Sequence, residues 1–116
     1  MIIIPVAPVP KPRMTKSDRW KKRECVQKYW QWKDLIKSYI QVLPAEFKVI
    51  FEVEMPQSWS EKKKKQKLGT PHQSRPDIDN FLKALMDAIE TEDGFVYSVE
   101  MKKIWGRTGR ITIEQL

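Results

Sequence analysis

Two aspartates two residues apart are the sharpest chemical feature of the chain. Asp77 and Asp79 lie in the stretch RPDIDNFLK (75–83), where the proline and the following apolar spacing predict the start of a helix. With one carboxylate at the cap position and the other in the first turn, both can converge on a single hard cation. Mg²⁺ prefers oxygen ligands, and one or two carboxylates plus a substrate phosphate are a usual set. Lys83, one turn beyond Asp79, would then stand where it can steady a phosphate oxygen or help a leaving group.

The same residues also suit a purely structural role. Asp77 is a credible N-cap, Asp79 favours the positive end of the helix dipole, and Asp79 with Lys83 forms the favoured acid-then-base pair at i,i+4. Together these contributions are worth about 1–3 kcal/mol. Asp87, one turn past Lys83, is expected to pair with that lysine or to be solvated. Spacing alone leaves the chemical and the structural interpretation open.

Positive charge is concentrated in two extended segments. The chain has 116 residues, 22 Lys+Arg against 15 Asp+Glu and a formal net charge of +7, which favours a polyanionic partner. One segment is a proline-rich basic arm (5–19), and the other is a polar stretch that is predicted to be a basic flexible loop (56–76). Both suit a DNA backbone, because each neutralised phosphate releases counterions. The predicted DNA-contacting residues are Lys11, Arg13, Lys16, Lys62, Lys63, Lys64, Lys65, Lys67 and Arg75.

Several classes of protein are disfavoured by what the sequence contains. A single cysteine, Cys25, allows no intrachain disulfide and no cysteine-built zinc site, and it fits a reducing, cytoplasmic setting. The apolar start is stopped by Pro5, too soon for a signal or membrane segment. No Gly-rich phosphate loop is present, so no nucleotide cofactor is expected.

Two single residues invite a functional role. His72, the only histidine, is expected to have no chemical role. Trp59 is expected either to stack on an unpaired base or to anchor its loop.

The elements that must position these residues follow from the hydrophobic periodicity. Spacings of three and four predict one helix from Asp18 to about Leu43 and a second from Asp77 or Asp79 to Asp93. Alternation predicts strands at 2–4, 47–55, 95–105 and 110–113, the last two joined by a hairpin turn at 106–109. The order β-α-β-loop-α-β-β predicts a single α+β (mixed α/β) domain over 1–116, with a small mixed sheet packed against two helices.

Three parts of the sequence together resemble the RusA family of Holliday junction resolvases: PVPKPR (8–13), the basic stretch before the aspartates, and RPDIDNFLKALMDAI (75–89). Members of that family are endodeoxyribonucleases of DNA recombination and repair, common in phages and prophages. They act on four-way junctions and other branched DNA as homodimers with paired Mg²⁺-dependent sites. The resemblance implies that Asp77 and Asp79 bind Mg²⁺, or Mn²⁺ in its place, and that Lys83 is the active-site lysine.

The chain departs from the family pattern at one place. Family members carry a further acidic pair soon after the second helix, whereas Ser98-Val99-Glu100 stands there in this sequence. The candidates for the third ligand are Glu100 and, before the apolar segment, Glu90, Glu92 and Asp93. Glu100 is the expected one, because Asp93 lies at the far end of a helix whose two ends are about 18 Å apart. The alternatives are an inactive or altered family member that only binds branched DNA, and a small basic RNA-binding protein with exposed aromatic residues on its sheet.

Overall fold

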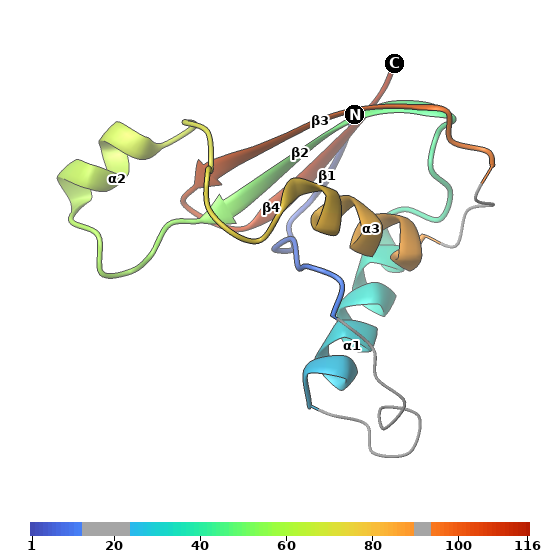
Figure 1. The fold of residues 1–116 in the computed structure, drawn as a ribbon, viewed down its shortest axis with the longest axis horizontal. Helices are drawn as coiled ribbons and strands as arrows, with labels where there is room; N and C mark the ends of the chain where they lie inside the picture. The colour runs from blue at the N-terminus through green and yellow to red at the C-terminus, as the bar shows by residue number, and fades with distance from the viewer. Residues whose placement is uncertain (13–23, 90–93) are drawn as a thin grey trace.

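The computed structural model describes residues 1–12, 24–89 and 94–116 (Figure 1). In these residues the fold is α+β, with a four-stranded mixed sheet and three helices, which confirms the predicted fold class. Among the described residues, no helix is long and apolar enough to cross a membrane. The elements in chain order are β1 (Ile2–Ile4), α1 (Glu24–Tyr39), β2 (Glu46–Glu54), α2 (Glu61–Lys67), α3 (Ile78–Ala88), β3 (Ser98–Gly106) and β4 (Arg110–Gln115).

The last two strands are arranged differently from the prediction. The strand order is β1-β4-β2-β3, so β2 lies between β3 and β4, parallel to the first and antiparallel to the second. The predicted hairpin at 106–109 is therefore wrong, since the two strands that this turn joins are not neighbours. Alternation identifies the buried face of a strand but not the strand beside it. At Gly109 a Cβ would lie 2.4 Å from the Cβ of Ala7, so the short connection needs glycine where it passes the N-terminal segment.

Helices α1 and α3 share one hydrophobic core with the sheet. Phe47, Val49 and Phe51 alternate along β2 and are fully buried, as the alternation predicted. The helices contribute Trp32 and Ile36 of α1 and the apolar stripe of α3 to the same core cluster. Because every second residue of β2 faces this core, the intervening residues of the strand face the opposite side of the sheet.

Helix α1 is shorter at its C-terminal end than its apolar spacing predicted. It ends at Tyr39, although Ile40 and Leu43 continue the buried stripe in the segment that follows. Burial continues past the last helical turn, so periodicity alone places the end of the helix too late. The predicted beginning at Asp18 lies outside the described residues.

The polar stretch 56–76 contains an element that the sequence did not reveal. The predicted loop holds the short helix α2, whose N-cap Ser60 accepts a hydrogen bond from the backbone of Lys63. None of the residues of α2 is buried. A helix without an apolar side has no periodic signal, which is why the stretch was predicted as a loop throughout.

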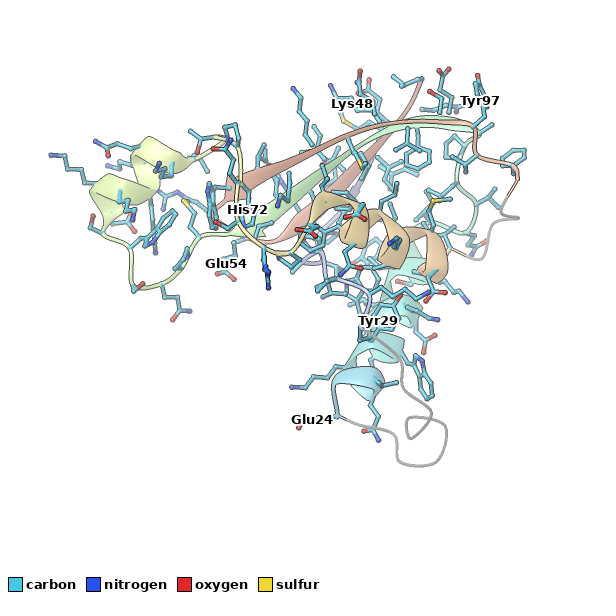
Figure 2. All side chains as sticks on the ribbon, in the orientation of Figure 1. Glu24, Tyr29, Lys48, Glu54, His72 and Tyr97 are labelled. Atoms are coloured by element: carbon cyan, nitrogen blue, oxygen red, sulfur yellow. The ribbon has the colours of Figure 1, made fainter. Side chains whose placement is uncertain are left out.

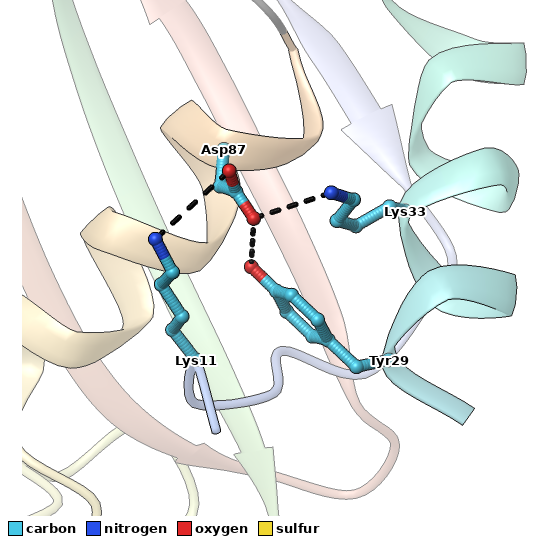
Figure 3. Close-up of polar contacts among 4 residues, drawn as sticks. All are labelled: Lys11, Tyr29, Lys33 and Asp87. Atoms are coloured by element: carbon cyan, nitrogen blue, oxygen red, sulfur yellow. Dashed lines mark hydrogen bonds and ion pairs between the residues drawn. The ribbon is translucent and has the colours of Figure 1, made fainter. Parts of the chain in front are cut away.

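Asp87 connects α3 to α1 and to the N-terminal arm (Figure 3). The Tyr29 hydroxyl donates to Asp87 Oδ2 at 2.7 Å, Lys33 Nζ lies 3.3 Å from the same oxygen, and Lys11 Nζ lies 4.0 Å from Oδ1. These partners replace the predicted Lys83, whose ion pair is with Asp79. Burial acts to raise the pKa of Asp87, but the hydrogen bonds from Tyr29 and Lys33 and the charges of Lys33 and Lys11 outweigh it and lower the pKa.

Tyr29→Phe is expected to destabilise the fold by about 1.5–3 kcal/mol, since it removes a hydrogen bond to a charged, partly buried carboxylate. Tyr39→Phe is the matched control, because Tyr39 is 45% exposed while Tyr29 is 3% exposed. Urea unfolding at pH 7 measures both variants. Because the pKa of Asp87 is lowered in the folded protein, its ionised carboxylate contributes fully to stability above the unfolded-state pKa of 3.8. That contribution is lost as the pH falls through the lower pKa of the folded state. Equal midpoints for the two variants would contradict this role of Tyr29.

Candidate metal site and basic surface

Asp77 and Asp79 stand at the N-terminal end of α3. Asp77 is the N-cap in an extended conformation, and its carbonyl accepts hydrogen bonds from the N–H groups of Asn80 and Phe81. Its side chain makes no capping hydrogen bond, although the structural interpretation of the sequence required one. Both carboxylates are exposed. The oxygens of Asp77 are therefore not engaged in holding the helix, and they face solvent where an external ligand can reach them.

Lys83 lies beside Asp79, as the spacing predicted. Its Nζ atom is 3.6 Å from Asp79 Oδ2, and the two side chains are 66% and 62% exposed. An ion pair this exposed contributes about 0–1 kcal/mol to stability. The main effect of Lys83 is thus to place an exposed positive charge next to the Asp79 carboxylate.

Buried contacts hold the helix that carries these groups. Phe81, between Asp79 and Lys83 in sequence, is 2% exposed and packs against Phe51 of β2 with ring centroids 5.4 Å apart. Leu85 continues the buried side of α3. Because Phe81 and Leu85 face the sheet, Asp79 and Lys83 are directed away from it.

Lys103 of β3 fixes the segment that leads into α3, a role that the sequence analysis missed. Its Nζ atom donates to the carbonyl oxygens of Ser74, at 2.5 Å, and Pro76, at 2.8 Å. The residue just before Asp77 is therefore tied to the sheet. Backbone carbonyl acceptors carry no side-chain signal, so nothing in the sequence indicated this contact.

Glu100 is not brought to the aspartate pair. Val99 and Met101 pack against the core, so Glu100 points to the other face of β3, where its carboxylate lies 4.0 Å from Lys48 Nζ. Figure 2 shows Lys48 on the side of the sheet away from α3. The strand does run beside the start of α3, but it does so at Lys103, which points to the opposite face from Glu100.

No other described residue completes the pair. Within the ranges that the structure describes, no group of three or more His, Cys, Asp or Glu side chains could hold a metal ion. The other acidic candidates, Glu90, Glu92 and Asp93, lie outside the described residues. Two exposed carboxylates nevertheless fit Mg²⁺, which is commonly bound by one or two carboxylates together with substrate phosphates and water.

The predicted DNA-contacting residues fall into four groups. Lys11 lies beside Asp87, Arg13 and Lys16 are outside the described residues, and Arg75 is exposed two residues before Asp77. The remaining five predicted contacts are all on α2: Lys62, Lys63, Lys64, Lys65 and Lys67.

An aromatic cluster attaches the basic stretch to the end of the sheet. Trp105 of β3 contacts Trp59 and His72, with ring centroids 4.9 Å and 4.2 Å apart. Figure 2 shows His72 where the chain returns from α2 to the sheet. His72 lies outside the helices and strands, as predicted, but it is 4% exposed and packs in this cluster. That it takes no part in catalysis stays a prediction. Of the two roles left open for Trp59, the structure shows the anchoring one.

Acidification below about pH 6.5 is expected to destabilise the cluster, because burial first, and the charge of Lys103 second, lower the pKa of His72. The unfolded chain then binds a proton that the folded chain does not, so stability is fully present above the unfolded pKa and falls as the pH drops towards the folded one. Thermal melts between pH 7.5 and 5 measure this loss, and His72→Phe should remove the part that depends on His72. Identical pH profiles for the wild type and the variant would contradict it.

One of the comparisons with known proteins gives a match. A family model described as Endodeoxyribonuclease RusA matches residues 5–114, which is nearly the whole chain. A search of curated proteins found no significant match.

Proposed function

The chain belongs to the RusA family of endodeoxyribonucleases, which resolve Holliday junctions, and from this premise we propose that it hydrolyses branched DNA with Mg²⁺ bound at Asp77 and Asp79. The observation that carries the proposal is the pair of exposed carboxylates at the start of α3. Asp77 is the N-cap residue, but its carboxylate makes no capping hydrogen bond and is available to a ligand. The biological setting that we propose is DNA recombination and repair.

The residues of the site have separate tasks in this reaction. Asp77 and Asp79 would hold the cation, and the DNA backbone would supply a phosphate as a further ligand. A bound Mg²⁺, or Mn²⁺ in its place, supplies polarisation of the phosphate and a water of lowered pKa. Lys83, 3.6 Å from Asp79, reaches the same phosphate and offsets the negative charge that develops on it. The buried ring of Phe81 and the hydrogen bonds from Lys103 to Ser74 and Pro76 hold the start of the helix in position.

A second candidate function is junction binding without cleavage. It is favoured by one observation, namely that no third acidic side chain joins Asp77 and Asp79 among the described residues. In that case the lysines of α2, with Lys11 and Arg75, would keep their affinity for branched DNA. The aspartate pair would hold a cation too weakly for hydrolysis.

A synthetic four-way junction separates the two functions. The wild-type protein is incubated with labelled junction and with a linear duplex of the same sequence, in Mg²⁺ and in EDTA. Paired nicks in the junction that need Mg²⁺ are the expected result. Binding in EDTA with no nicking in Mg²⁺ supports the second function, and neither binding nor cleavage contradicts both.

A homodimer is expected, because two symmetric nicks across a four-way junction call for two active sites related by a two-fold axis. Helix α1 leaves large apolar side chains at the surface, with Trp30 at 38%, Leu35 at 47% and Tyr39 at 45% exposure. Sedimentation at micromolar concentration measures the mass of the particle. A single species at the chain mass of 13.8 kDa would exclude the dimer.

A further inference from the structure

We propose that residues 59–72, here called the basic lobe, bind the DNA backbone as a docked unit next to the aspartate pair, and that Trp59 is the positioning residue that holds the lobe in place. The choice of DNA as the partner rests on the proposed function. The inference goes further because it assigns the phosphate-binding surface to a folded, attached element.

The charge of α2 calls for a polyanion. Its sequence, EKKKKQK, has five lysines and one glutamate, and no residue in it is buried. Lysines at i,i+3 and i,i+4 repel each other, and a helix this short is not stable by itself in water. Phosphates bound along its surface would relieve that repulsion.

The lobe is attached to the edge of the sheet despite this repulsion. The Trp59 ring packs on Trp105, and Lys63 Nζ lies 4.2 Å from the centre of the Trp59 ring. Backbone hydrogen bonds join Gly69 and Thr70 to Trp105, at 2.9 and 3.0 Å.

An ion pair adds a further attachment beyond the end of β3. Glu61 of α2 pairs with Arg107 at 3.3 Å. Figure 1 shows α2 standing out from this end of the sheet. The lysines are thus presented on a fixed support.

The same edge of the sheet positions the aspartate pair. The carbonyl of Lys103 accepts a hydrogen bond from the His72 N–H at 2.9 Å, and its Nζ atom holds Ser74 and Pro76. From His72 to Asp77 the chain can span at most about 18 Å. That length corresponds to about five base-pair steps of B-DNA. A duplex arm with one phosphate at Asp77 therefore has further phosphates within reach of the lobe.

The composition of α2 favours DNA over an anionic membrane. A helix that lies on a membrane buries an apolar face among the lipids. Helix α2 has no apolar residue, so it can contribute only charge, hydrogen bonds and its rigid position. Those are the contributions that a DNA backbone requires.

The first test removes charge from the lobe. Binding of a fluorescent four-way junction is measured in EDTA at a series of KCl concentrations, with the wild type, with Lys62→Gln/Lys65→Gln, and with Lys48→Gln/Lys102→Gln as the control pair on the opposite face of the sheet. We expect the lobe pair to reduce the slope of log affinity against log salt by about two and the control pair to leave it unchanged. Equal reductions would mean that only net charge matters and would overturn the proposal. Because no metal is present, the result does not depend on whether the protein cleaves.

The second test undocks the lobe without changing its charge. Trp59→Ala is expected to weaken binding in EDTA about two- to tenfold, the range that corresponds to the loss of one aromatic pair, while Trp59→Phe restores it. Circular dichroism melts show whether both Trp59 variants are folded. If Trp59→Ala does not fold, the Lys62→Gln/Lys65→Gln variant tests whether the lobe binds DNA. Wild-type binding by folded Trp59→Ala would overturn the positioning role. Tighter binding to phosphatidylserine vesicles than to the junction would overturn the choice of partner.

Discussion

Asp77→Asn and Asp79→Asn are each expected to abolish Mg²⁺-dependent cleavage of a four-way junction and to leave junction binding intact or tighter. An amide keeps the size of the carboxylate but removes the negative charge that holds the cation. Loss of a residue that only orients a metal ligand costs 10–100-fold in activity or affinity, so replacing a ligand itself should cost at least about 100-fold. Removing a negative charge close to the DNA phosphates also lowers repulsion, which explains the tighter binding.

The matched control for both substitutions is Asp34→Asn. Asp34 is an exposed aspartate of α1 and has no place in the proposed site. Cleavage rates, junction affinities in EDTA and circular dichroism melts are compared for all three variants. Unchanged cleavage by either site variant would contradict its role as a ligand, and so would a joint loss of cleavage and binding that follows from unfolding.

Phe81→Ala is expected to have the largest effect on stability, about 3–5 kcal/mol, since it leaves a cavity beneath the helix that carries the site. Domains of this size are stable by about 5–15 kcal/mol, so the variant should lose a large share of its folding free energy. Phe81 is 2% exposed, whereas Phe95 is 50% exposed, which makes Phe95→Ala the matched control. Urea unfolding curves that coincide for the two variants would show that Phe81 does not anchor α3.

Elements with a buried side could be predicted from the sequence, and elements without one could not. The alternation of Phe47, Val49 and Phe51 predicted β2 almost to the residue. The stripe with Phe81 and Leu85 predicted the start of α3, but the helix ends at Ala88 and not at the predicted Asp93. Helix α2 was missed because all of its residues are polar or charged. The pairing of β3 with β2 was missed because the choice of neighbour depends on the whole sheet rather than on a local pattern.

The site divides in the same way. The place of Asp77 at the helix cap follows from local signals, and so does the ion pair of Asp79 with Lys83. The hydrogen bond from Lys103 to the Pro76 carbonyl and the packing of His72 on Trp105 are contacts between distant segments of the chain. The spacing of residues in the sequence does not encode such contacts. Glu100 was expected at the site from its position along the chain, and the face of β3 on which it lies separates it from the pair.

The most direct test of the central claim, that Asp77 and Asp79 hold the catalytic metal, is a crystal structure of the protein soaked in Mn²⁺ and measured for anomalous scattering. We expect a peak with carboxylate oxygens of both aspartates at about 2.1 Å, the oxygen distance of a small divalent cation. The same map would identify any third carboxylate, whether from residues 90–93 or from elsewhere in the chain. A soaked crystal with no manganese at this pair, or with manganese bound only at other residues, would contradict the claim.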